Sequence, residues 1–141
     1  MTTFFFYGTL MDSDVRAAVL GNYVADELVL DARLPGWQRV WLRGRSYPVV
    51  VPSSVASVEG LEVSFAAGTG KAVTNSLISL EGPEYTLKTL TLSSDGNASV
   101  FVGSRHCHPT GRPWSLSHWE NDINELSSAG HSGGALSERR E

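Results

Sequence analysis

The chain has 141 residues, a net charge of -4 and a single cysteine, Cys107. This length favours one domain, because a second core would be too small to fold alone. With 41% hydrophobic and 18% charged residues, the composition is that of a globular protein. The acidic balance gives no attraction for nucleic acid or anionic lipid, and one cysteine excludes an intramolecular disulfide and a multi-thiolate metal site.

No stretch of the sequence reaches the roughly 20 apolar residues that span a bilayer, so no membrane association is expected. The N-terminus lacks a basic segment, and Gly8 and Asp12 interrupt its apolar run too early for a signal peptide. The sequence therefore predicts a cytoplasmic protein, either a monomer or a homodimer.

The first predicted elements are a short strand and a helix. Phe4–Tyr7 is a continuous aromatic run, which is typical of a buried strand, and Gly8 ends it. Either Asp12 or Ser13 can cap a helix that runs to about Leu20, where the next residue is a glycine that stops it.

The middle of the chain alternates β-prone runs with turn residues. The strands predicted there are residues 28–34, 37–42, 47–51 and 58–65. A helix is predicted over Lys71–Leu80, because Val73, Leu77 and Leu80 recur at helical spacing.

A hairpin and a last helix complete the predicted elements. Residues 85–92 and 98–103 are β-prone, and Asp95-Gly96-Asn97 between them indicates the turn. A helix is expected from residue 115 to about 126, and residues 127–141 are expected to form a disordered tail beyond a domain of residues 1–126. Strands and helices in this mixed order predict an α+β fold with an antiparallel or closed sheet.

The first candidate site is Tyr7-Gly8-Thr9-Leu10. Glycine after a buried strand lets the backbone turn sharply and come close to a ligand, because no Cβ intervenes. Successive N–H groups in such a turn favour a carboxylate or a developing oxyanion. An ordinary connection from strand to helix explains these residues equally well.

The second candidate is Glu81, at the C-terminal end of the predicted helix over residues 71–80. Negative charge there is unfavourable against the helix dipole, and a catalytic role is one explanation for it. On these residues alone, a solvated carboxylate in a turn is the preferred interpretation.

The third candidate is Arg105-His106-Cys107-His108. If this stretch is extended, His106 and His108 project from the same face, as a pair of metal ligands would. A further ligand from His118, His131 or the acids of the tail would require the chain to fold back. A surface loop is the preferred interpretation, and no metal is expected.

Taken together, these residues resemble the γ-glutamylcyclotransferase-like family, over residues 4 to about 121. The segment from Phe5 to Leu10 is similar to the family's Tyr-Gly-[Ser/Thr]-Leu signature, which follows a hydrophobic strand. Residues 77–85 are similar to the block Leu-Asp-x-x-Glu-Gly-x-x-Tyr. Three further resemblances are Tyr47-Pro48 with Val50 and Pro52, Glu59-Gly60 with Val63, and the spacing of Trp114 and Trp119.

The resemblance implies a small mixed or antiparallel β-barrel with flanking helices, and a cavity between the glycine turn and the glutamate. It also implies conversion of a γ-glutamyl amide to 5-oxoproline and a free amine. The substrate's own α-amino group is then the nucleophile, so no cofactor is expected. The resemblance places the catalytic role on Glu81. The residues that it implies for substrate binding are Tyr7, Gly8, Thr9, Leu10 and Tyr85.

Two positions depart from the family pattern. Ile78 stands where an aspartate is common, and Phe101 stands where a tyrosine is frequent. The second change removes a hydroxyl from the implied pocket. A catalytically inactive binding or regulatory domain of the same fold is therefore the alternative to an enzyme.

Overall fold

The computed structural model describes residues 1–45 and 47–117. Most of the predicted last helix, Trp119 and the predicted tail lie outside these residues. The strands are β1 (Thr2–Phe6), β2 (Leu28–Leu42), β3 (Pro48–Phe65), β4 (Tyr85–Thr91), β5 (Asn97–Gly103) and β6 (Pro109–Pro113). The helices are α1 (Ser13–Leu20) and α2 (Gly70–Glu81), with short 3-10 helices η1 (Thr9–Met11) and η2 (Gly21–Asp26).

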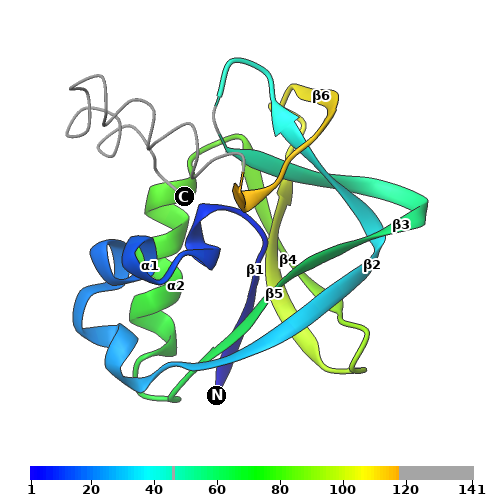
Figure 1. Cartoon of the computed structure of the whole chain (residues 1–141). Helices are drawn as coiled ribbons and strands as arrows, with labels where there is room; N and C mark the ends of the chain where they lie inside the picture. The colour runs from blue at the N-terminus through cyan, green and yellow to red at the C-terminus, as the bar shows by residue number, and fades with distance from the viewer. Residues whose placement is uncertain (46, 118–141) are drawn as a thin grey trace.

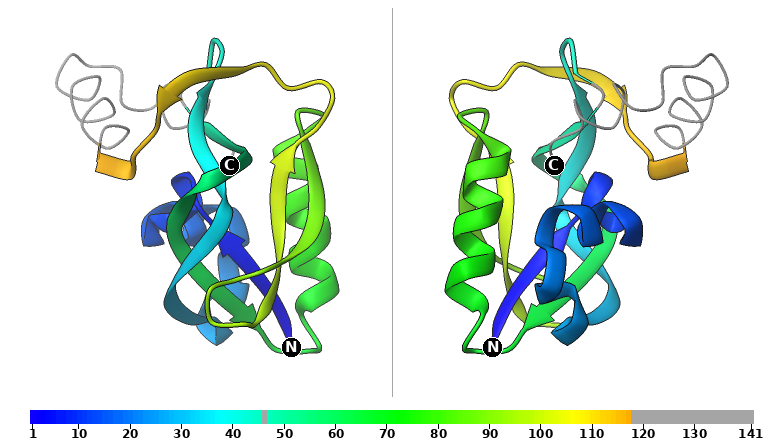
Figure 2. Two further views of the ribbon diagram at one scale, coloured as in Figure 1. Left: turned by 90° about the vertical axis from the view of Figure 1, so that its right-hand side faces the viewer. Right: turned by 90° about the vertical axis from the view of Figure 1, so that its left-hand side faces the viewer.

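The six strands form one mixed sheet in the order β4-β5-β1-β3-β2-β6 (Figure 1). Neighbouring strands run antiparallel except β1 and β5, which are parallel. The sheet curls into a half-barrel, and the right-hand view of Figure 2 shows both α-helices in front of it. The predicted α+β class is confirmed. No helix of the described ranges is both long enough and apolar enough to cross a membrane.

The core lies on both faces of β1, because side chains of a strand alternate between the faces of a sheet. Phe4 and Phe6 pack into a cluster that includes residues of both helices, among them Leu20 and Leu77. Phe5 and Tyr7 pack into a second cluster. The continuous aromatic run of β1 is therefore explained by a central strand that is buried on both sides.

Helix α1 begins and ends as the sequence predicts. The Oδ1 atom of Asp12 accepts the N–H groups of Asp14 and Val15, at 2.9 and 3.1 Å. The helix ends at Leu20, and Gly21 follows with a φ of 58°. This left-handed conformation is one that glycine adopts without strain.

The prediction of four separate strands between residues 28 and 65 is wrong. Residues 28–42 form one strand and residues 48–65 another, paired along most of their length. The break between the first two predicted strands, 28–34 and 37–42, is a bulge, in which the register shifts between Pro35 and Trp37 and Gly36 takes a φ of 88°. Local turn residues therefore bend the long hairpin without ending its strands.

The edge strand β6 was not predicted, because two of its five residues are proline and one is glycine. Proline lacks the N–H that a central strand needs and is tolerated at an edge. Pro113 and Pro109 lie opposite Val40 and Leu42 of β2, which is the only strand that β6 pairs with in the described sheet.

Candidate active site

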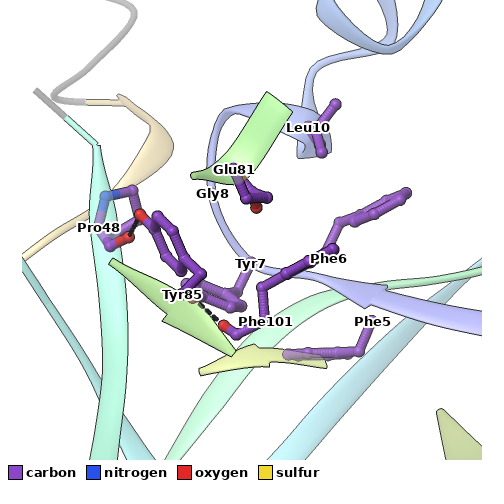
Figure 3. Close-up of a pocket in the computed structure, with 9 residues that line it drawn as sticks. All are labelled: Phe5, Phe6, Tyr7, Gly8, Leu10, Pro48, Glu81, Tyr85 and Phe101. Atoms are coloured by element: carbon purple, nitrogen blue, oxygen red, sulfur yellow. Dashed lines mark hydrogen bonds between the residues drawn. The ribbon is translucent and has the colours of Figure 1, made fainter. Parts of the chain in front are cut away.

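A pocket lies at the end of β1, between the glycine turn and the last turn of α2 (Figure 3). Its cavity volume is about 20 Å³, which is room for about one water molecule. The residues that line it are Phe5, Phe6, Tyr7, Gly8, Leu10, Pro48, Glu81, Tyr85 and Phe101. Of the residues predicted for this pocket, Thr9 is the one that does not line it, and Thr9 is fully buried.

Helix α2 carries Glu81 to the pocket. Val73 and Leu77 are fully buried and fix the inner face of the helix against the core. Glu81 is the last residue of the helix, and Gly82 ends it with a φ of 76°. The Oε2 atom of Glu81 is buried, and Figure 3 shows the side chain close to Gly8 in projection. The residue as a whole is partly exposed, and a negative charge at a helix C-terminus is unfavourable against the helix dipole.

The departure at Ile78 lies outside the pocket. The Ile78 side chain is 50% exposed and is not a lining residue. By contrast, Phe101 is buried and lines the pocket. The position at which the resemblance implies a missing hydroxyl is therefore one that lines the pocket.

Opposite Glu81, the chain turns from β1 into η1. The N–H of Met11 donates to the carbonyl oxygen of Gly8, and the N–H of Asp12 donates to that of Thr9, both at 3.0 Å. These two bonds close the 3-10 turn. The first N–H groups of a helical turn have no acceptor within that turn, so in general they bond to groups outside it.

Arg16 of α1 holds the far end of the same turn. Its Nη1 atom donates to the carbonyl oxygens of Leu10 and Met11, both at 3.0 Å. Its Nε and Nη2 atoms reach the carboxylate of Glu27 at 3.2 to 3.3 Å. The side chains of Arg16 and Glu27 are 5% and 11% exposed, so this ion pair is part of the protein interior.

Arg39 of β2 holds the near end of the turn. Its Nη1 atom donates to the carbonyl oxygen of Tyr7 at 2.8 Å and to that of Glu59 at 3.0 Å. Burial lowers the pKa of Arg39 from its usual value, yet an arginine remains a cation at neutral pH. Together, Arg16 and Arg39 place two positive charges against the carbonyl side of the turn.

Two tyrosine hydroxyls brace the walls of the pocket. The hydroxyl of Tyr85 donates to the carbonyl oxygen of Pro48 at 2.6 Å, and that of Tyr7 donates to the carbonyl oxygen of Phe101 (Figure 3). A tyrosine has a single O–H. Each of these hydroxyl oxygens can therefore only accept a further hydrogen bond.

Sequence reasoning missed Arg16, Arg39 and Pro48 as residues of the site or its support. Arg39 was visible only as a charged residue within the β-prone run 37–42, and Arg16 only as a cation in a predicted helix. Their roles depend on carbonyl groups of another element, which a one-dimensional pattern does not identify.

The segment that contains His106 and His108 is a turn. The N–H of Cys107 donates to the carbonyl oxygen of Ser104 at 3.1 Å, and both histidines are exposed. The extended geometry that would align the two imidazoles is therefore not formed. Among residues 1–45 and 47–117, no group of three or more His, Cys, Asp or Glu side chains is placed to hold a metal ion. His118 and His131 lie outside these ranges.

A mixed half-barrel sheet with two helices on one side defines a γ-glutamyl cyclotransferase-type fold, and comparisons with known proteins agree. The chain belongs to the γ-glutamyl cyclotransferase, AIG2-like family, whose model matches residues 4–121. It is 35% identical over 94 residues to AIG2-like protein A of Arabidopsis thaliana, which covers 67% of this chain and 53% of that protein. The chain thus spans about half the length of this relative.

Solved structures show the same fold at lower identity. The solution structure of an Arabidopsis thaliana protein matches with a TM-score of 0.61 and 24% identity, covering 99% of this chain and 95% of that one. A γ-glutamyl cyclotransferase matches with a TM-score of 0.60 and 11% identity, covering 96% and 84% of the two chains.

Proposed function

We propose that this protein converts a γ-glutamyl amide to 5-oxoproline and a free amine. The observation that carries the proposal is that the Glu81 carboxylate and the Gly8 turn line one pocket. Membership of the γ-glutamyl cyclotransferase, AIG2-like family supports the same reaction class.

In this reaction the α-amino group of the substrate attacks its own γ-carbonyl carbon. A carbon–nitrogen bond closes the five-membered lactam, and the bond to the leaving amine breaks. The protein must hold the glutamyl chain folded so that the amine and carbonyl meet, and such positioning can supply roughly 7–11 kcal/mol. We assign this task to the turn at Gly8, Thr9 and Leu10, together with the walls formed by Tyr7 and Tyr85.

Glu81 is assigned the proton transfers. Its carboxylate takes a proton from the attacking ammonium, and the carboxylic acid returns a proton to the leaving amine. General acid–base catalysis of this kind contributes about 10²–10⁴-fold. Because the pocket has a volume of about 20 Å³, binding of a glutamyl group requires the pocket mouth to widen.

The test is release of 5-oxoproline from a panel of γ-glutamyl amides, measured by mass spectrometry. Wild-type protein should release 5-oxoproline from at least one amide, and Glu81→Gln should lower kcat by about 10²–10⁴-fold. The matched control is Glu84→Gln, because Glu84 lies three residues away, outside the pocket, and pairs with Arg45 at 3.5 Å. Equal rates for wild type and a folded Glu81→Gln variant would contradict the role of Glu81.

The second candidate is a binding domain of the same fold without turnover. The observation that favours it is Phe101, which lines the pocket without a hydroxyl. In that case wild-type protein would bind a γ-glutamyl amide in calorimetry and release no 5-oxoproline. Restoring the hydroxyl with Phe101→Tyr then tests whether the missing group limits turnover.

A further inference from the structure

Arg39 joins three segments that are distant in sequence. Its Nη1 atom donates to the carbonyl oxygens of Tyr7 and Glu59, at 2.8 and 3.0 Å. Its Nε atom donates to the carbonyl oxygen of Trp114 at 3.1 Å. The buried Trp114 ring lies against the guanidinium, with 5.4 Å between the ring centroid and the Arg39 Cζ atom. The guanidinium is therefore held from several sides.

The bond to Tyr7 fixes the direction of the neighbouring N–H group. The described peptide bonds include no cis bond, and in a planar trans peptide the C=O and the following N–H point in opposite directions. Since the Tyr7 carbonyl points at Arg39, the N–H of Gly8 points away from Arg39. Gly8 lines the pocket, whereas Arg39 does not.

We propose that Arg39 is a positioning residue for substrate binding, which orients the Gly8 N–H toward the glutamyl group without touching the substrate. This inference rests on the proposed function. The planar guanidinium serves three carbonyl groups in fixed directions, a geometry that a lysine ammonium does not reproduce. A free Tyr7–Gly8 peptide could rotate and present its carbonyl oxygen in place of the N–H, which would repel a carboxylate of the bound substrate.

The experiment compares Arg39→Met and Arg39→Lys with wild type, using the γ-glutamyl amide that wild type turns over. The control is Arg33→Met, because Arg33 lies on the same strand and pairs with the side chain of the same Glu59, at 2.6 Å and in an exposed position. Arg39→Met should raise KM, and the inhibition constant of 5-oxoproline, by about tenfold each, as expected for one lost hydrogen bond to a charged group. The kcat of correctly folded protein should change less than about threefold.

Arg39→Lys keeps the charge and a donor, so its KM should lie between those of wild type and Arg39→Met. It also serves as the test if Arg39→Met does not fold. A merely structural role would lower the folded fraction and the melting temperature while leaving KM unchanged. Unchanged KM and inhibition constant in a folded Arg39 variant would overturn the positioning role, as would an equal rise in Arg33→Met.

Failure of the proposed function gives a different result, namely no 5-oxoproline from wild-type protein. The positioning role is then judged by calorimetry with L-glutamine, which is itself a γ-amide. Tenfold weaker binding to Arg39→Met than to wild type would support it. Equal binding, or no binding to wild type, would overturn it.

Discussion

The Nη1 atom of Arg16 lies 3.0 Å from the carbonyl oxygen of Leu10, so helix α1 is tied directly to the turn that lines the pocket. The same guanidinium is paired with Glu27 in the interior. A buried cation with several acceptors is stable only while those acceptors remain, because removing one partner leaves the other charge desolvated and uncompensated.

Arg16→Met should therefore lower the free energy of unfolding by about 3–5 kcal/mol, because the Glu27 carboxylate and two carbonyl groups lose the guanidinium as their partner. Urea unfolding followed by circular dichroism measures this change. Arg33→Met is the control, since its ion pair with Glu59 is 48% and 71% exposed and such surface pairs contribute about 0–1 kcal/mol. Similar losses in the two variants would show that Arg16 is not held as an interior ion pair.

Gly60 of β3 should not tolerate even a methyl group. A Cβ there would lie 2.4 Å from the carbonyl oxygen of Phe6 and 2.7 Å from the ring of Phe5. Gly60→Ala should lower the free energy of unfolding by about 1–3 kcal/mol or more, because the backbone of β1 must shift. Gly68→Ala, with no atom within 4 Å of the added Cβ, should leave the urea midpoint almost unchanged. If Gly60→Ala and wild type had the same urea midpoint, β1 and β3 could move apart without loss of stability.

Tyr85→Phe tests the hydrogen bond from Tyr85 to Pro48 in the wall of the pocket. It removes the hydroxyl that donates to the buried carbonyl oxygen of Pro48, so the free energy of unfolding should fall by about 1–3 kcal/mol. The control is Thr91→Val, which removes an exposed hydrogen bond to Asn97 and should cost less than about 0.5 kcal/mol. Thermal unfolding of both variants measures the difference, and a Tyr85→Phe protein as stable as Thr91→Val would argue against the brace.

The elements that the sequence predicts correctly are those with local causes. Helix α1 follows from the cap at Asp12 and the stop at Gly21, and α2 follows from the spacing of Val73 and Leu77, both fully buried. The order of strands was not predictable in this way. The parallel pairing of β1 with β5 joins segments 95 residues apart, Phe4 lying opposite Ser99.

The candidate site likewise combines residues that local sequence patterns predict with residues that they do not. The positions of Glu81 and Gly8 follow from where a helix and a strand end, and the pocket contains both. Thr9 was predicted beside them, but it is fully buried and is not among the lining residues. A 3-10 turn rotates successive side chains by about a third of a turn, so neighbouring residues face different sides. The contribution of Arg39 depends on a carbonyl group 32 positions away, which no local pattern indicates.

Cys107 should be a slow nucleophile. Burial raises the pKa of its thiol, and the nearby Glu84 carboxylate raises it further. A raised pKa leaves less thiolate at a given pH, and the thiolate is the reactive form. Alkylation by iodoacetamide at pH 8 should therefore be slower in the folded protein than in urea, and should rise toward the unfolded rate as the pH increases. Folded protein that reacts as fast as unfolded protein at pH 8 would contradict the burial of the thiol. Cys107 does not line the pocket, so Cys107→Ser should still release 5-oxoproline if wild type does.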